Sequence, residues 1–168
     1  MIKLVAFDLD GTIADTIPMC IEAFKQAVSP YASKILSEND IVKTFGLNEE
    51  GMIKEVVSED WEKALIDFYV IYKEMHTVYI QPFVGIRELI TELKKNSIIV
   101  SLITRKGQRS CDITLHHFEM EALFNSISIG SPDRNTKANQ QKWYMLEMNF
   151  PILPLVVKLE YNAYLLHG

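Results

Sequence analysis

Two aspartates stand one residue apart at the end of an apolar segment near the start of the chain. Residues 2–7 show little polar alternation, which is typical of a strand buried on both faces of a parallel sheet. Side chains at positions i and i+2 of a strand point the same way, so Asp8 and Asp10 are expected side by side at its carboxyl end. Open α/β sheets bind ligands at this end. Gly11 and Thr12 follow, and backbone amides at such a turn can form an anion-binding concavity.

These residue types in this order suggest phosphoryl chemistry. Two carboxylates beside an anion site need a cation, and Mg²⁺ is suitable because it takes a few carboxylate oxygens, water and a substrate phosphate. One aspartate could attack phosphorus while the other moves protons. Asp8-Leu9-Asp10-Gly11 alone could be only a polar turn, but the complete string from the apolar run through Thr12 favours the functional interpretation.

The string Phe7-Asp8-Leu9-Asp10-Gly11-Thr12 resembles the first of the four motifs of the haloacid dehalogenase (HAD) superfamily of phosphohydrolases, in a phosphoglycolate phosphatase-like arrangement. The resemblance implies an α/β fold, with a doubly wound parallel-sheet core and an inserted helical cap. It also implies that Asp8 is the nucleophile that forms an aspartyl phosphate. Asp10 would then be the acid for the leaving group and the base for water.

The pattern along the chain agrees with such an organisation. Helical periodicity between residues 16 and 80 predicts about four helices and no strand, whereas after residue 81 strands alternate with helices, which favours parallel β-α units. Further strands are expected at 98–103, 127–129 and 155–157. The expected domains are a core of residues 1–15 and 81–168 and a cap of residues 16–80. Candidate N-caps of the cap helices are Asp15 or Thr16, Ser37, Asn48 and Ser58.

Polar residues at two later points are candidate phosphate ligands. Thr104 ends the second strand, where a hydroxyl can donate to phosphate and where the HAD resemblance implies the second-motif residue. Arg105 and Lys106 add positive charge, although each could simply be solvated. Lys137 begins the helix after the third strand, where a cation is unfavourable to the helix dipole. The resemblance implies that a lysine near this point neutralises the nucleophile and the phosphate, and Lys142 is the competing candidate.

The fourth motif departs from the pattern. The HAD resemblance implies an acidic pair after the fourth strand, but here Lys158 and Leu159 occupy these positions, and Glu160 and Asn162 are the only plausible replacements. The expected Mg²⁺ ligands are therefore Asp8, the backbone carbonyl of Asp10, and Glu160. The chain ends at Gly168, before the closing strand and helix usual in the family. This favours a truncated or degenerate member, or a chain whose last segment was altered.

Composition and charge exclude several classes of protein. A hydrophobic content of 48% and a charged content of 23% indicate a globular chain rather than a disordered one. No apolar run approaches the ~20 residues that span a bilayer, no signal peptide is evident, and a net charge of −5 argues against a nucleic-acid surface. Cys20 and Cys111 are expected as reduced thiols in the cytoplasm. His76, His116, His117 and His167 lack metal-ligand spacing and are expected at the surface or at interfaces.

Three functions follow from these observations. The first is a Mg²⁺-dependent phosphatase acting on a small phosphorylated metabolite, with neither nucleic acid nor membrane as a partner. The second is a binding or regulatory protein that has kept the phosphate site but lost effective turnover. The third is a phosphomutase of the same family. The intact first motif favours the enzyme, the altered fourth motif favours the binding protein, and the oligomeric state stays open.

Overall fold

Strand β1 (Leu4–Phe7), which carries the aspartate motif, lies inside a parallel sheet of order β3-β2-β1-β4. The structure is a computed structural model that describes residues 2–132 and 155–157. The other strands are β2 (Ile99–Ile103), β3 (Ser126–Ser128) and β4 (Leu155–Val157). Within the sheet, Val5 of β1 pairs with Val100 of β2 on one side and with Leu155 of β4 on the other. The four predicted strands and the α/β class are confirmed. Because β1 has parallel neighbours on both sides, its carboxyl end lies where such sheets bind ligands.

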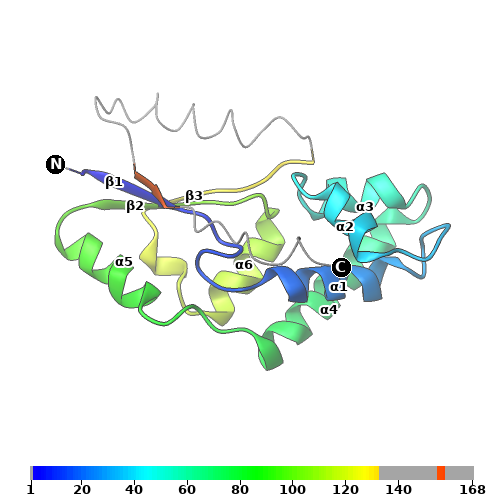
Figure 1. Cartoon of the computed structure of the whole chain (residues 1–168), viewed down its shortest axis with the longest axis horizontal. Helices are drawn as coiled ribbons and strands as arrows, with labels where there is room; N and C mark the ends of the chain where they lie inside the picture. Colours follow the sequence, from blue (N-terminus) through cyan, green and yellow to red (C-terminus); the bar gives the residue numbers. More distant parts are fainter. Residues whose placement is uncertain (1, 133–154, 158–168) are drawn as a thin grey trace, which may run out of the picture.

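The helices divide into two groups (Figure 1). The first group lies beyond the carboxyl ends of the strands and consists of α1 (Ile17–Val28), α2 (Glu38–Thr44), α3 (Glu49–Val56) and α4 (Trp61–Tyr79). The second group connects the strands and consists of α5 (Ile86–Lys95), α6 (Gln108–His117) and the short 3₁₀ helix η1 (Glu121–Leu123). The predicted helix after residue 136 lies outside the described residues.

Strand β1 is buried on both faces, as its sequence predicts. Val5 and Phe7 join the main core with the helices, whereas Leu4 and Ala6 pack with Ile103 on the opposite face. All four side chains of the strand are at most 6% exposed. This burial holds the strand, and the motif that follows it, in a fixed position. In the part of the chain that the structure describes, no helix is both long and apolar enough to cross a membrane.

Two of the predicted helix caps are correct. Ser37 and Asp40 form a capping box, and the Asn48 side chain accepts a hydrogen bond from the amide of Gly51. The prediction for Ser58 is wrong, because the chain makes a further turn and α4 begins only after Asp60, which takes a left-handed conformation with φ of 58°. Thr16 does precede α1, but its hydroxyl does not cap the helix. It donates instead to the Asp10 carboxylate.

A buried polar cluster joins α4 to α6. The Tyr72 hydroxyl lies 2.8 Å from Thr114 Oγ1, which lies 3.0 Å from His76 Nε2. The other ring nitrogen of His76 donates to the Tyr72 carbonyl oxygen at 2.8 Å. His76 is 1% exposed, so the surface position expected for it is wrong: the helical stripe that carries Tyr72 also buries His76. Burial lowers the pKa of His76 to about 4.

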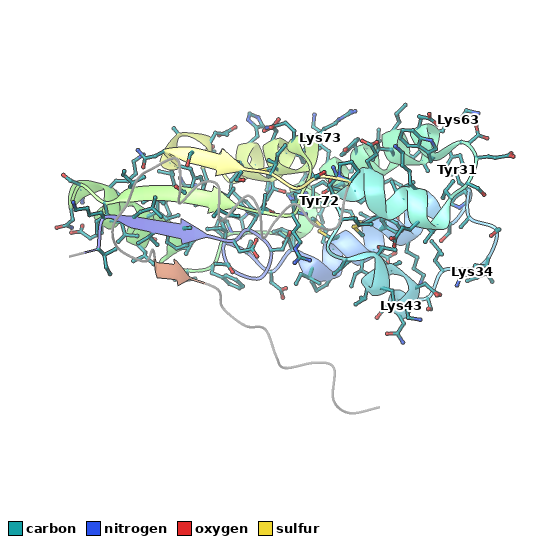
Figure 2. The ribbon with its side chains drawn as sticks, turned by 90° about the horizontal axis from the view of Figure 1, so that it is seen from above. Tyr31, Lys34, Lys43, Lys63, Tyr72 and Lys73 are labelled. Carbon is teal, nitrogen blue, oxygen red and sulfur yellow. The ribbon has the colours of Figure 1, made fainter. Side chains whose placement is uncertain are left out.

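We predict that His76→Gln weakens the acid dependence of stability. The pKa of His76 is lower in the folded chain than the ordinary value of 6.5, so folding opposes its protonation, and stability is lost as pH falls from 6.5 toward 4. The wild type should lose on the order of 2 kcal/mol more than the variant between pH 7 and pH 5, measured by urea unfolding. Lys73→Gln, at an exposed position of the same helix beside Tyr72 (Figure 2), should keep the wild-type dependence. Identical pH profiles for wild type and His76→Gln would contradict the assignment.

Candidate active site

The turn after β1 is fixed by its own backbone. Gly11 takes a φ of +72°, a conformation that favours glycine, and its amide donates to the Ala14 carbonyl oxygen at 2.8 Å. The Thr12 amide donates to the Leu9 carbonyl oxygen at 3.2 Å. Both expected amide donors of an anion site thus have partners within the turn. At the end of the turn, the Phe83 amide donates to the Ile13 carbonyl oxygen at 2.8 Å, which ties the chain after α4 back to the motif.

A cavity of about 690 Å³ opens between the strand ends and the first group of helices. Its floor comes from the ends of β1 and β2, and its remaining walls come from α1, the segment between α2 and α3, α3 and α4. In the part of the chain that the structure describes, the charged side chains that line it are Asp8, Asp10, Glu49, Arg105 and Lys106. The apolar side chains contributed by the helices and by the segment between α2 and α3 include Ile17, Phe24, Phe45, Leu47, Met52 and Phe68.

Asp8 and Asp10 both line this cavity, as their spacing predicts. Asp8 Oδ1 accepts a hydrogen bond from the Leu9 amide at 2.9 Å. Asp10 Oδ1 accepts from the Thr16 hydroxyl and lies 3.2 Å from the ammonium of Lys106. The Asp10 side chain retains 26% exposure, so the carboxylate is held by two partners and still reaches the cavity.

Lys106 is the cation that the sequence interpretation underestimated. Its side chain is 5% exposed, and Nζ lies 3.1 Å from Cys20 Sγ and 4.7 Å from the centre of the Tyr72 ring. Burial alone would lower the pKa of this ammonium, but Asp10 and Glu49 are among the neighbours that hold the pKa well above its ordinary value. Lys106 therefore carries its charge inside the site. Its position two residues after the strand-ending Thr104 is the signal that could have identified it.

Glu49 was not identified as a site residue from the sequence. It begins α3, is 5% exposed, and its Oε2 accepts a hydrogen bond from the Gly107 amide at 2.8 Å, at the start of α6. Next to it, the Asn48 amide donates to the Ser131 carbonyl oxygen at 3.0 Å. Burial raises the pKa of Glu49, and the nearby Lys106 opposes this rise. These contacts fasten α3 to the loops after β2 and β3 and enclose one end of the cavity.

The other predicted phosphate ligands are Thr104, Arg105 and Lys137, and the first two differ from one another in exposure. Thr104 is fully buried, and its hydroxyl accepts from the Lys106 amide at 3.2 Å. Arg105 is exposed, but its guanidinium approaches Gly46, where an added Cβ would lie 2.8 Å from Nη1. Lys137 lies outside the described residues, so its phosphate contact stays a prediction.

Two of the three expected metal ligands, Asp8 and Asp10, lie within the described residues. Asp8 and Asp10 offer hard oxygen atoms in one cavity, which suits Mg²⁺. Within residues 2–132 and 155–157 there is no group of three histidine, cysteine or acidic residues placed to hold a metal. Glu160, the third expected ligand, and the fourth-motif segment from Lys158 onward lie outside the described residues.

We predict slow alkylation of Cys20 near neutral pH. Burial raises the pKa of this thiol to about 11, with Lys106 acting in the opposite direction. Since the thiolate is the reactive form, only about one molecule in a thousand is reactive at pH 8. The rate of iodoacetamide labelling, assigned by peptide mass spectrometry, should rise about tenfold per pH unit between pH 7.5 and 9.5. Lys106→Met should react more slowly still, and a plateau near pH 8.5 would refute the assignment.

The comparison with known sequences agrees with the motif. Residues 5–146 match the family model described as Haloacid dehalogenase-like hydrolase. Pyrophosphatase PpaX of Bacillus mycoides (strain KBAB4) is 21% identical over 126 residues, covering 75% of this chain and 59% of the relative. Pyrophosphatase PpaX of Bacillus cereus (strain G9842) is also 21% identical over 126 residues, covering 75% of this chain and 58% of the relative. The chain thus spans less than two thirds of the length of these curated relatives.

Solved structures share the fold of this chain at similarly low sequence identity. CbbY from Rhodobacter sphaeroides, in complex with phosphate, superposes with a TM-score of 0.73 at 16% identity, covering 90% of this chain and 74% of that one. A predicted phosphoglycolate phosphatase from Haemophilus somnus 129pt gives a TM-score of 0.69 at 21% identity, covering 88% of this chain and 71% of that one. The fold likeness and the family match, which covers most of the sequence, lead to one conclusion: the chain belongs to the haloacid dehalogenase-like hydrolases.

Proposed function

We propose that this protein is a phosphatase that hydrolyses monoesters of phosphate through an aspartyl-phosphate intermediate. The observation that carries the proposal is the meeting of Asp8, Asp10 and the buried cation of Lys106 in one cavity at the carboxyl end of β1. Family membership supports it, because the family is named for hydrolases and the relatives are named pyrophosphatases. The altered sequence at Lys158 and Leu159 keeps a phosphate-binding protein without turnover as the second candidate.

In this mechanism the Asp8 carboxylate attacks phosphorus, and the bond between phosphorus and the leaving oxygen breaks. Asp10 gives its proton to that oxygen, so the alcohol departs neutral. Asp10 then takes a proton from a water molecule, which attacks the aspartyl phosphate and releases phosphate and the Asp8 carboxylate. Thr16 acts as a positioning residue, since its hydroxyl donates to Asp10 Oδ1, and the Lys106 ammonium pairs with the same oxygen.

Phosphate recognition is assigned to groups around the strand ends. We propose Thr104, Arg105, Lys106 and Lys137 as ligands of the phosphoryl oxygens, with the Gly11-Thr12 turn shaping the site. In the described residues, Lys106 is the cation with the strongest support, because an electrostatic interaction is worth more at a buried position than in water. Asp8, Asp10 and Glu160 would hold Mg²⁺, which supplies charge neutralisation of the phosphoryl group when bound.

The arrangement of the domains follows from the same proposal. Residues 1–15 and 81–168 would form the core, and residues 16–80 a cap that excludes water from the reacting phosphoryl group. The substrate would be a small phosphorylated metabolite met in the cytoplasm, where Cys20 and Cys111, both unbridged in the structure, would stay reduced. The net charge of −5 supports the exclusion of nucleic acid as a partner.

We predict that Asp8→Asn abolishes Mg²⁺-dependent hydrolysis of p-nitrophenyl phosphate. The amide is nearly isosteric but cannot form the acyl phosphate, so kcat should fall by at least about 1,000-fold while the melting temperature changes little. Asp15→Asn is the matched control, because Asp15 follows the same turn but does not line the cavity. Retained turnover in Asp8→Asn would rule out the covalent mechanism. An inactive wild type that still binds inorganic phosphate would instead support the second candidate.

We predict unequal effects at the two adjacent cations. Lys106→Met keeps the length of the side chain but removes a buried charge beside Asp10, and kcat/KM for p-nitrophenyl phosphate should fall about 100-fold. Arg105→Met removes an exposed charge that water screens, and the loss should stay below about tenfold. Equal losses in the two variants would show that the burial of Lys106 does not determine its contribution.

A further inference from the structure

The helical walls of the cavity are apolar. Phe24 of α1 and Phe68 of α4 are 1% and 2% exposed, and their rings meet edge to face at 6.3 Å. Phe45, Leu47 and Met52 extend this surface from the segment between α2 and α3 and from α3. The aspartates and Lys106 lie at the strand ends, so a phosphate bound there would direct its ester substituent toward the aromatic and aliphatic side chains.

The charges around the cavity are unevenly distributed. Within the described part of the chain, three carboxylates line it, from Asp8, Asp10 and Glu49, against the two cations Arg105 and Lys106, both from the loop after β2. Among the described residues, α1 to α4 contribute no lysine or arginine to the lining. Figure 2 shows Lys34, Lys43 and Lys63 at the outer margin of these helices, away from Tyr72. Of the residues that the structure describes, Glu49 is the charged residue that α1 to α4 contribute to the lining. Its carboxylate lies at the start of α6, and the Arg105 guanidinium approaches Gly46 in the segment between α2 and α3.

We propose that this cavity selects phosphate monoesters with an uncharged apolar substituent, most simply an aromatic one, and that Glu49 disfavours substrates with a second anionic group. The inference rests on the proposed function in placing the phosphate at Asp8. It goes further by assigning the class of leaving group and a specificity-determining residue.

Apolar and charged substituents would meet different surroundings in the cavity. An aromatic ring would leave water for contact with the half-buried side chains of Ile17, Phe45 and Met52, which is favourable and gains from edge-to-face packing on Phe45. A carboxylate or a second phosphate would lose its hydration against the same side chains, and burying a charge without a partner is costly. It would also face Glu49, whose carboxylate is held in place by the Gly107 amide.

The test uses two phosphonates, because they cannot be hydrolysed and report affinity whether or not the protein turns over. Phenylphosphonate carries an aromatic substituent and phosphonoacetate carries a carboxylate. Calorimetry on the full chain with Mg²⁺ present should show phenylphosphonate binding at least about tenfold more tightly. Glu49→Gln keeps an oxygen for the Gly107 amide but removes the charge, and should tighten phosphonoacetate about tenfold while changing phenylphosphonate less than about twofold.

A second pair of variants tests the wall itself. Met52→Lys adds a cation to the cavity and should shift the preference toward phosphonoacetate. Ile66→Lys, at a position of α4 that is 55% exposed and outside the cavity lining, should leave both affinities unchanged. A Met52→Lys variant with the wild-type preference would overturn the assignment of this wall to the substituent.

The remaining outcomes separate the inference from the proposed function. Equal affinities in the wild type, tighter phosphonoacetate binding, or binding of neither phosphonate would overturn the inference. A Glu49→Gln variant that weakens both phosphonates alike would show that Glu49 is structural. Hydrolysis of p-nitrophenyl phosphate without any phosphonate preference would reject only the inference. A preference without hydrolysis would reject only the proposed turnover.

Discussion

The candidate site depends on one buried positive charge. An ammonium removed from water is stable only when nearby groups compensate it, and Lys106 has Asp10 at 3.2 Å and the Tyr72 ring at 4.7 Å. Asp10 follows β1 and Lys106 follows β2, so their pairing ties together the ends of two neighbouring strands. Cys20 from α1 and Tyr72 from α4 approach the same ammonium. A single charge therefore fixes the sheet and two helices around the cavity.

Glu49 provides a second connection between the same parts. A carboxylate beside the first amide of a helix is stabilised by the hydrogen bond and by the helix dipole, and Glu49 occupies this position at the start of α6. Because Glu49 is 5% exposed, moving α3 away from α6 would separate the carboxylate from this partner. Lys106 holds the strand ends to α1 and α4, and Glu49 holds α3 over them.

The sequence predicted the parts of the structure that depend on short-range patterns. The apolar run before Asp8, the capping box at Ser37 and the alternation of strands and helices are all local, and each is confirmed. The depth of Lys106 and the position of Glu49 depend instead on partners 96 and 58 residues away in the chain, Asp10 and Gly107. His76 was misplaced for the same reason, since its burial needs Thr114 on α6. No local pattern contains these pairings.

The predictable part of the site is the aspartate motif, to which the chemistry is assigned, and the unpredictable part is the apolar wall, to which the substrate preference is assigned. The position of the aspartate pair is set by β1 and by the turn that follows it, and both are local. Phe24 and Phe68 have the helical spacing of ordinary core residues. The sequence alone therefore does not distinguish a residue that only packs in the core from one that also lines the cavity. Phe24 and Phe68 line the cavity and are also 1% and 2% exposed, so they belong to the core and to the wall at once. The proposed substrate preference therefore depends on long-range packing, whereas the proposed chemistry depends on a motif of a few residues.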